Sequence, residues 1–240
     1  MSELLYFIHD KINCSGCTAC SHVCPTSCIE MLSDEEGFYY PYYNVEKCIN
    51  CKKCERICPI LNSKNEGDIN INQFVVTARS KNNTIWHKST SGGAFSEICK
   101  SYGDKDTIIV GVEMLNLKAV HSSVVGVENI EKFRKSKYVQ SDLKDVFVEV
   151  EKYLNNGVKL IFSGAPCQIA GLKSYLKKGY DNLFLIDFIC HGVGSPLVFT
   201  NYIKYINEKS GKTIKNYSFR EKVKLNGKYN NFHSKYEYKW

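Results

Sequence analysis

Two short cysteine runs near the N-terminus constrain this chain more than any other feature. Each follows the pattern C-x2-C-x2-C-x3-C-P, once from Cys14 to Pro25 and once from Cys48 to Pro59. Thiolates at this spacing wrap one face of a cuboidal iron–sulfur cluster, and in paired runs the fourth cysteine ligates the other cluster. A zinc ion is held instead by two separated C-x2-C pairs. The doubled runs therefore favour two [4Fe–4S] clusters over zinc.

The crossover of the fourth cysteine assigns four ligands to each cluster. The first set is Cys14, Cys17, Cys20 and Cys58, and the second set is Cys48, Cys51, Cys54 and Cys24. Because eight ligands are then assigned, we interpret Cys28 as a small packed residue and not as a ninth ligand. We expect residues 1–60 to form a two-cluster ferredoxin-type domain.

The distribution of the cysteines also bears on the cellular compartment. Nine of the twelve cysteines fall between Cys14 and Cys58, whereas a secreted disulfide scaffold spreads them along the chain. The N-terminus shows no basic stretch followed by a long apolar one, so no secretory signal is expected. No apolar run approaches eighteen residues, so no membrane span is expected. These features predict a cytoplasmic protein.

Positive charge is concentrated in the last forty residues. Residues 201–240 hold ten Lys or Arg against three Asp or Glu, interleaved with aromatic residues. A nucleic-acid surface has this composition, but so do a helix and two strands with lysines on the solvent side. Because the whole chain is rich in Lys, Asn, Ile and Tyr, we favour the second interpretation and expect no nucleic-acid partner.

A second domain is expected beyond the cysteine runs. Residues 61–72 are polar and without hydrophobic periodicity, which predicts a linker. Strand-like runs follow at 74–78, 107–112, 119–125, 159–162 and 183–189, and helix-like runs begin near Gly93, Asp142, Pro166 and Pro196. This alternation predicts a mixed α/β domain over residues 73–240. The expected fold class is therefore α+β: a small two-cluster ferredoxin-like domain followed by a mixed α/β domain.

Three turns rich in Gly, Ser and Pro precede predicted helices. They read S-T-S-G-G-A-F-S at 89–96, F-S-G-A-P-C-Q-I-A-G at 162–171 and D-F-I-C-H-G-V-G-S-P at 187–196. Backbone N–H groups at a helix start hold anionic groups such as a pyrophosphate. Each turn taken alone is more simply a helix cap. The sequence contains no G-x-G-x-x-G and no G-x-x-x-x-G-K-[ST] motif, so a Rossmann fingerprint and a P-loop are not expected.

The cysteine runs come first, the three turns follow, and Y-S-F-R-E-K-V stands at 217–223. In this order the motifs resemble the family of coenzyme F-420 hydrogenase/dehydrogenase beta subunits. The resemblance runs from about Cys14 to about Lys224. It implies an iron–sulfur flavoprotein that binds FAD and passes electrons between its clusters and a hydride-accepting deazaflavin. The residues implied at the flavin are Ser91, Gly92 and Gly93 in one loop and Gly164, Cys167 and Gln168 in another.

The resemblance further implies a third [4Fe–4S] cluster in a longer chain, with Cys167 and Cys190 as two of its ligands. Relatives continue past this point with a later cysteine-containing segment, so we expect a chain that is incomplete at its C-terminus or a short variant. Four thiolates are the usual requirement, so this chain is expected to hold about eight iron atoms. Two thiols packed under the turns are the alternative interpretation of Cys167 and Cys190.

The sequence is compatible with two functions. The first is an oxidoreductase whose flavin reacts with coenzyme F-420, a nicotinamide, another flavin or a redox partner protein. The second is a non-catalytic ferredoxin-type electron carrier with an α/β docking domain. A flavin spectrum of the purified protein distinguishes them.

Smaller features are given structural roles. Cys99 shares an apolar helix face with Phe95 and Ile98, so it is expected in the core. Five histidines lack partners at catalytic spacing and are expected to be exposed or satisfied by neighbours: His9, His22, His87, His121 and His233.

Overall fold

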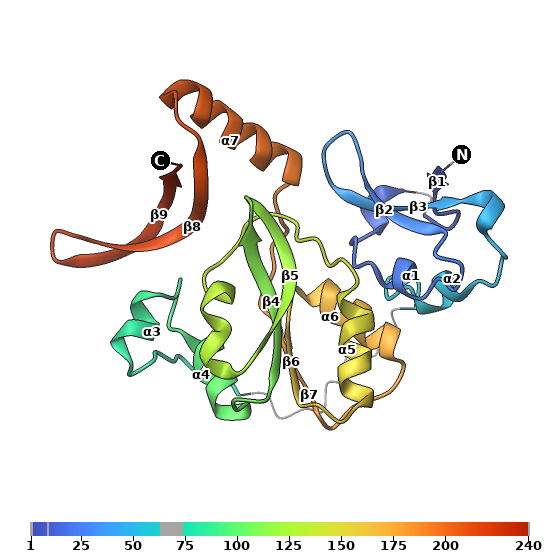
Figure 1. The fold of residues 1–240 in the computed structure, drawn as a ribbon, viewed down its shortest axis with the longest axis horizontal. Coiled ribbons are helices and arrows are strands. Elements are labelled where there is room, and N and C mark those ends of the chain that lie inside the picture. Colours follow the sequence, from blue (N-terminus) through green and yellow to red (C-terminus); the bar gives the residue numbers. More distant parts are fainter. Residues whose placement is uncertain (1, 9, 63–73, 240) are drawn as a thin grey trace. The chain divides into compact units, whose positions relative to one another are not determined.

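A computed structural model describes residues 2–8, 10–62 and 74–239 of the chain (Figure 1). The chain divides into two compact units. The first unit comprises Met1–Thr77 and Ala165–Gly179, and the second comprises Ala78–Gly164 and Tyr180–Trp240. The expected fold class is confirmed, because a ferredoxin-like region precedes an α/β domain with a mixed sheet. Most of the predicted linker, residues 63–72, lies outside the described residues.

The first unit is built on a small antiparallel sheet. Its strand order is β1-β3-β2, with β1 at Ser2–Leu4, β2 at Ile29–Ser33 and β3 at Tyr39–Asn44. Each cysteine run contains one short helix, α1 at Ala19–His22 and α2 at Lys53–Ile57. A 3-10 turn precedes each run, η1 at Lys11–Asn13 and η2 at Val45–Lys47.

The apolar core of the first unit is small. Leu5, Cys28 and Ile29 are its buried members, and several of the predicted cluster ligands pack against them. Helix α6 (Pro166–Leu176) completes this unit and packs against α1 and α2. A unit with so little buried apolar surface needs another source of stability.

The second unit contains a four-stranded mixed sheet in the order β5-β4-β6-β7. Strands β4 (Ile108–Leu115) and β5 (Lys118–Val125) form an antiparallel hairpin. Its two-residue turn, Asn116 and Leu117, has positive φ at both positions, which matches the right-handed twist of the strands. Strands β6 (Leu160–Ser163) and β7 (Leu183–Ile186) continue the sheet in parallel with β4.

The predicted strands are confirmed at four of the five positions, with different ends. The run 183–189 is a strand only as far as Ile186. The strand predicted at 74–78 is wrong: this segment has no regular structure, and its apolar side chains are exposed, Phe74 to 90% and Val75 to 98%. A run of aromatic and β-branched residues forms a strand only where a neighbouring strand is available to pair with it.

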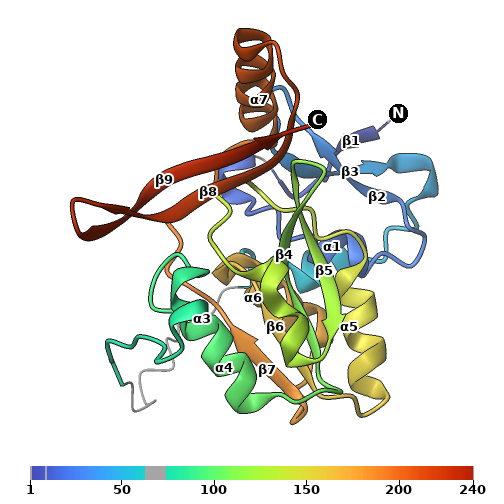
Figure 2. The same ribbon diagram turned by 60° about the vertical axis from the view of Figure 1, so that its left-hand side comes forward.

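Helices cover both faces of this sheet (Figure 2). Helix α4 (Ala94–Tyr102) and the 3-10 helix η3 (Val127–Phe133) pack on the face that carries Ile109 and Ile161. Helix α5 (Val146–Asn155) packs on the other face, where Phe147 contacts Phe162. The short helix α3 (Asn83–His87) precedes α4. Helix α5 begins four residues later than predicted, whereas α4 and α6 begin close to their predicted positions.

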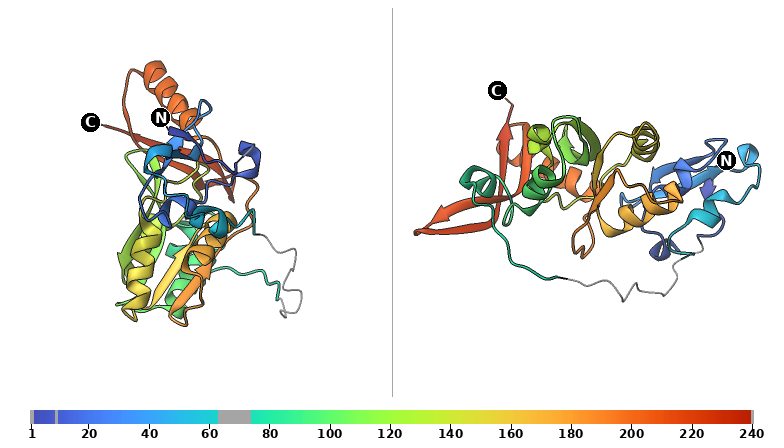
Figure 3. Two further views of the ribbon diagram at one scale, coloured as in Figure 1. Left: turned by 90° about the vertical axis from the view of Figure 1, so that its right-hand side faces the viewer. Right: turned by 90° about the horizontal axis from the view of Figure 1, so that it is seen from below.

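The basic C-terminal region forms a helix and two strands, as its pattern predicted. Helix α7 (Pro196–Ser210) begins at Pro196, and the side chain of Ser195 caps it. Strands β8 (Ile214–Leu225) and β9 (Lys228–Tyr238) form a long hairpin, drawn in red in Figure 3. Phe199 and Ile203 of α7 are buried with Ile214 of β8 in one apolar cluster.

Candidate metal centres and cofactor loops

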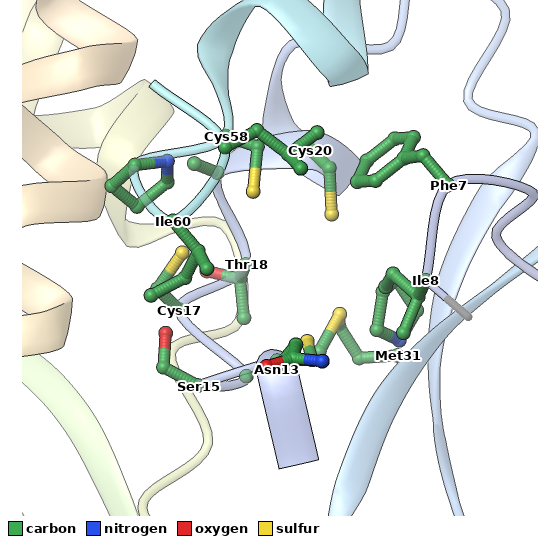
Figure 4. Close-up of a pocket in the computed structure, with 16 residues that line it drawn as sticks. Phe7, Ile8, Asn13, Ser15, Cys17, Thr18, Cys20, Met31, Cys58 and Ile60 are labelled. Atoms are coloured by element: carbon green, nitrogen blue, oxygen red, sulfur yellow. The ribbon is translucent and has the colours of Figure 1, made fainter. Parts of the chain in front are cut away.

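A first cavity in the first unit brings together one predicted ligand set. Its volume is about 60 Å³. The cysteines that line it are Cys14, Cys17, Cys20 and Cys58. Figure 4 shows sulfur atoms around this cavity, with Phe7 and Ile8 on the side away from Cys17. Three of the cysteines come from the first run, and Cys58 ends the second run, as the crossover pattern requires.

A second cavity brings together the other predicted ligand set. Its volume is about 20 Å³. The cysteines of that set that line it are Cys24, Cys48, Cys51 and Cys54. Cys24 follows α1 at the end of the first run, so each run supplies three thiols to one cavity and one thiol to the other.

The two runs have the same unusual backbone. Gly16 (φ 63°) and Asn50 (φ 51°) precede the second cysteine of each run, and Thr18 (φ 64°) and Lys52 (φ 56°) follow it. Left-handed residues turn the chain sharply, which directs three nearby cysteines into one cavity. Glycine adopts this conformation freely, whereas Thr and Lys adopt it at a steric cost. Backbone of this kind occurs at ligand-binding segments and also in tight turns, as at Leu117 between β4 and β5.

The donors in the two cavities fit polynuclear clusters better than single ions. Within the described part of the chain, no three Cys, His or carboxylate side chains converge on one ion-sized point. The eight predicted ligands surround two separate cavities, four to each. Four thiolates per site is the donor set of a [4Fe–4S] cluster, whereas zinc requires four donors that converge on one ion.

Burial makes the thiols of Cys14, Cys17 and Cys20 in the first cavity weaker acids. It raises the pKa of Cys17 to about 11 and that of Cys20 well above the ordinary value. Burial is also the largest cause of the raised pKa of Cys14. Cluster ligands are thiolates, so binding of iron at these residues must release protons.

Cys28 has a role beyond packing that its sequence context did not reveal. It is buried beside Leu5 and Ile29, as expected, but it also lines the second cavity. Its Sγ atom lies 3.4 Å from Sγ of Cys24. Burial acts to raise the pKa of Cys24, but hydrogen bonds from Thr26 and Cys28 together lower it, whereas burial raises the pKa of Cys28 to about 11. Cys24 is therefore the stronger acid of this pair, and Cys28 is the weaker acid beside it.

Helix α6 closely approaches the first cavity. The contacting residues lie more than 150 positions apart in the sequence, and the motifs did not predict this contact. A Cβ atom at Gly171 would lie 3.0 Å from Cβ of Cys17 and 3.1 Å from its Sγ. The absence of a side chain at Gly171 therefore permits the approach. Cys167, one turn earlier on α6, raises the pKa of Cys14 as one of the smaller contributions. The ring of Tyr175 packs edge-on against His22 of α1, with ring centres 6.0 Å apart.

The loop Ser89–Gly93 lies in the second unit and is held by its neighbours. The Oγ1 atom of Thr90 accepts a hydrogen bond of 3.0 Å from the backbone N–H of Ser136. The ammonium of Lys222 on β8 donates to the carbonyl oxygens of Trp86, Ser89 and Ser91. The loop is thus fixed against two other segments before α4 begins.

Both glycines of this loop have a structural reason to be glycine. A Cβ atom at Gly92 would lie 2.1 Å from the carbonyl oxygen of Ala78, which no side chain allows. Gly93 caps α4 with φ +92°, a conformation that glycine favours. Their positions in the sequence are therefore explained without a ligand.

The remaining predicted cofactor residues also have local partners. The backbone N–H of Gly164 donates to the carbonyl oxygen of Ile186. The Oε1 atom of Gln168 accepts a 2.9 Å hydrogen bond from the N–H of Ala165 at the start of α6. The Sγ atom of Cys190 accepts a 3.4 Å hydrogen bond from the N–H of Gly192. Cys167 belongs to the first unit and Cys190 to the second.

Two of the smaller expectations need correction. Cys99 is fully buried, as expected, but Ile98 is 36% exposed and lies at the edge of the apolar face of α4. His121 is neither exposed nor satisfied: it is 3% exposed, and no described residue forms a well-aligned hydrogen bond with either ring nitrogen. Burial lowers the pKa of His121 to about 3, with the backbone of Ser163 opposing the shift, so the ring is neutral. The available signal was that His121 directly follows the apolar pair Ala119 and Val120 in a predicted strand.

The paired cavities give residues 13–61 the cysteine arrangement of a two-cluster ferredoxin. Residues 13–61 match the 4Fe-4S dicluster domain family. Residues 157–239 match the family described as the C terminus of the coenzyme F420 hydrogenase/dehydrogenase beta subunit. The two matches fall in the order that the sequence motifs predicted, and each covers less than half of the chain, so they confirm the resemblance for these two segments.

Individual relatives match parts of the chain. A component of the F(420)H(2) dehydrogenase of Methanosarcina mazei is 29% identical over 170 residues, which cover 65% of this chain and 46% of that protein. An uncharacterized ferredoxin of Methanocaldococcus jannaschii is 46% identical over 52 residues, 22% of this chain and 66% of that protein. The match thus spans about half the length of the dehydrogenase component.

A solved structure shows a weaker similarity. A polypeptide of the F420-reducing [NiFe] hydrogenase complex of Methanosarcina barkeri aligns with a TM-score of 0.40 and 16% identity, over 64% of this chain and 58% of that chain.

Within the described residues, no helix combines the length and the apolar character that crossing a membrane demands.

Proposed function

We propose that this protein is an iron–sulfur oxidoreductase that passes electrons between two [4Fe–4S] clusters and an FAD. The flavin would exchange hydride with a deazaflavin such as coenzyme F420 or with a similar acceptor. In this proposal residues 1–60 form the two-cluster module, residues 61–72 the linker and residues 73–240 the flavin-binding domain. The proposal extends the family match of residues 157–239 to a cofactor and a reaction.

The observation that carries the proposal is the grouping of eight cysteines into two cavities. Each cavity combines three thiols from one run with one from the other. The proposed ligands are Cys14, Cys17, Cys20 and Cys58 for cluster I, and Cys48, Cys51, Cys54 and Cys24 for cluster II. A crossed arrangement holds the two clusters in one small rigid module, which suits successive single-electron transfers.

The residues around the first cavity control access to cluster I. Phe7, Ile8 and Met31 line it with apolar groups. Such a lining limits the approach of water, and solvent exposure is one of the factors that set the reduction potential of a cluster. The chain would therefore tune cluster I mainly through these side chains.

The proposed flavin residues are Ser91, Gly92 and Gly93, with Gly164, Cys167 and Gln168. A bound FAD would supply the hydride chemistry, while the protein supplies binding and orientation. The carbonyl oxygen of Ser91 is held by Lys222 at 2.6 Å, so this loop is ordered in advance of any ligand. Preformed loops of this kind bind ligands at a lower entropic cost.

Anaerobic purification tests the proposal when iron, sulfide and flavin are quantified on the same sample. We expect about eight iron atoms and about eight sulfides for each chain, with one FAD retained or taken up on reconstitution. An absence of flavin after reconstitution with FAD would contradict the flavin part, and an iron content of about two would contradict the clusters.

A non-catalytic electron carrier is the second candidate. It is favoured by the structural roles of Gly92, Gly93 and Gln168, which need no cofactor to explain them. In this case the second unit would bind a redox partner protein. A brown protein that holds both clusters and takes up no flavin would support the carrier.

We also propose that Cys167 and Cys190 are two ligands of a third [4Fe–4S] cluster in a longer chain. Two thiolates are fewer than the four that such a cluster requires. In this chain, substitution of either cysteine by serine should therefore leave the iron content at about eight atoms. A fall to about four would show that one of them supports cluster I or II.

A further inference from the structure

A third cavity lies in the second unit and differs in kind from the two cysteine cavities. Its volume is about 360 Å³, which falls within the range of small-molecule binding pockets. Segments from β4, η3 and the following loop, and β8 contribute to its wall. We refer to it as the cationic cavity.

Positive charge dominates this wall. The cations that line it are Lys88, Lys132, Arg134, Lys135, Lys137 and Lys215, and the carboxylates that line it are Glu113 and Glu131. Like charges at this density repel one another unless counter-charges neutralise them. The excess of cations over carboxylates therefore favours an anionic ligand.

Some of these charges already have protein partners. Lys132 pairs with Glu113 at 2.8 Å, and Lys88 pairs with Glu131 at 2.5 Å. Lys135 pairs with Glu221 on β8. Both lining carboxylates are thus engaged. Arg134 helps to lower the pKa of Glu131, and Lys215 helps to lower the pKa of Glu237 on β9. Among the described residues, neither Arg134 nor Lys215 forms a direct ion pair with a carboxylate.

Lys137 is a structural member of the wall. Its ammonium donates to the carbonyl oxygens of Phe133 at 3.0 Å and Arg134 at 2.7 Å, at the end of η3. Burial lowers its pKa to about 7, with Glu113 opposing and Lys135 adding to the shift. This lysine therefore fixes the loop 134–137, and with a pKa of about 7 it carries only part of a positive charge at neutral pH.

Arg134 is held in a defined orientation. Its Nε–H donates a 2.9 Å hydrogen bond to Oγ of Ser96 on α4. The planar guanidinium has five donors arranged to match phosphate oxygens. Because Ser96 already orients the guanidinium of Arg134, this side chain loses little further conformational entropy when it binds a phosphate.

The rest of the wall defines the ligand further. Met114, Leu117 and Phe219 contribute apolar surface to the same cavity. Ser136, also in the wall, donates its backbone N–H to Thr90 of the Ser89–Gly93 loop. The cavity thus combines a cationic part with an apolar part beside a hydroxyl-rich loop.

We propose that the cationic cavity binds an organic diphosphate, with Arg134 and Lys215 contacting the phosphates and the apolar wall contacting the organic part. The inference deepens the proposed function, since the FAD proposed above is an organic diphosphate. A free nucleoside diphosphate has the same chemistry, so the experiment must distinguish the two sources. Inorganic anions lack the organic part and should bind less tightly.

The test measures binding to the full chain purified anaerobically with its iron. ADP, FAD and riboflavin are titrated by calorimetry into the natural protein and into Arg134→Gln/Lys215→Gln. The control is Lys105→Gln/Lys209→Gln, which removes two exposed charges that do not line the cavity. We expect the first double variant to bind ADP and FAD at least roughly tenfold more weakly, and the control to bind as the natural protein does.

Two further measurements protect the test against loss of folding. Lys215→Gln alone changes an exposed residue and should still weaken diphosphate binding. Arg134→Lys keeps the charge but removes the fork, so it should recover part of the affinity. Riboflavin, which carries no phosphate, should bind the natural protein and the Arg134→Gln/Lys215→Gln variant equally.

The outcomes separate this inference from the proposed function. If FAD binds the natural protein and the double variant equally, the flavin function stands and the cationic cavity is not its diphosphate site. If ADP binds through Arg134 and Lys215 while FAD does not bind, the cavity inference stands and the flavin proposal fails. If neither ADP nor FAD binds the natural protein, the cavity inference is overturned.

Discussion

The two units of this chain are stabilised in different ways. The second unit has a four-stranded sheet with helices on both faces and large side chains, such as Phe147 and Phe162, that are fully buried. The first unit has a three-stranded sheet and a small apolar cluster around Leu5 and Ile29. Eight cysteines occupy the space where a larger domain would place its core. We therefore expect the stability of the first unit to depend on bound clusters and that of the second unit to depend on apolar burial.

Removal of iron should separate the two units most clearly. We expect chelation to unfold residues 10–62 completely, because thiols alone cannot replace the bonds to the clusters. The sheet of the second unit should remain folded. Limited proteolysis followed by mass spectrometry measures this, with early cuts expected in 10–62 and protection retained in 108–163. Equal protection of both regions in the iron-free protein would refute the comparison.

Within the first unit, Cys24→Ser should damage cluster II although Cys24 belongs to the first run. The variant should lose about four of about eight iron atoms, because a fourth ligand crosses to the other cluster. Iron analysis and electron paramagnetic resonance of the reduced protein measure the loss. Cys28→Ser is the matched control, since Sγ of Cys28 lies 3.4 Å from Sγ of Cys24 but Cys28 is not one of the eight proposed ligands. Loss of cluster I with cluster II intact would reverse the ligand assignment.

The second unit should respond to acid through His121. Its pKa is about 3 in the folded protein and about 6.5 when unfolded, so the unfolded state binds a proton first as the pH falls. The stability that the neutral ring contributes is complete above about pH 6.5 and is lost at lower pH. We expect a loss of about 3 kcal/mol between about pH 7 and about pH 4.

Chemical denaturation that follows the second unit at several pH values tests this dependence. His121→Phe keeps a ring that can stack on Phe162 and should flatten the pH profile. His191→Gln, an exposed control, should leave the profile unchanged. A profile that is equally steep in His121→Phe would assign the acid sensitivity to other groups.

Gly171→Ala should produce the smallest effect and should act on one cluster only. The added Cβ would lie 3.0 Å from Cβ of Cys17, which is closer than side-chain carbons normally approach. The cost of this overpacking should exceed the gain in helix propensity, so the first unit should lose about 1 kcal/mol of stability. A redox titration should show a shifted potential for cluster I and an unchanged potential for cluster II. Gly179→Ala meets nothing within 4 Å and is the control. Equal shifts in both clusters would mean that α6 does not act locally.

The sequence predicted those features that depend on short spacing. The two cysteine runs indicated both ligand sets, and the structure groups these residues into two cavities. The starts of α4, α6 and α7 followed from Gly93, Pro166 and Pro196, because caps and prolines act locally.

Features that depend on distant contacts were not predictable in the same way. The approach of Gly171 to Cys17 joins segments over 150 residues apart, and no periodicity encodes it. The proximity of Cys28 to Cys24 depends on how the chain turns at Ser27, which has φ 49°. The cationic cavity combines η3 with β8, whose charges appear in the sequence as two unrelated basic stretches. The strand predicted at 74–78 was wrong because pairing with a neighbouring strand, and not β propensity alone, decides whether a strand forms.

The packing of Gly92 limits what sequence comparison can teach about this loop. Since a Cβ atom there would overlap the carbonyl oxygen of Ala78, every natural variant that keeps this fold must keep glycine at that position. If another protein has glycine at the position of Gly92, this indicates a similar backbone geometry. It does not indicate that the other protein binds the same molecule. The fold permits other side chains at Arg134 and Lys215. A change of ligand among related proteins would therefore appear as substitutions at these two positions.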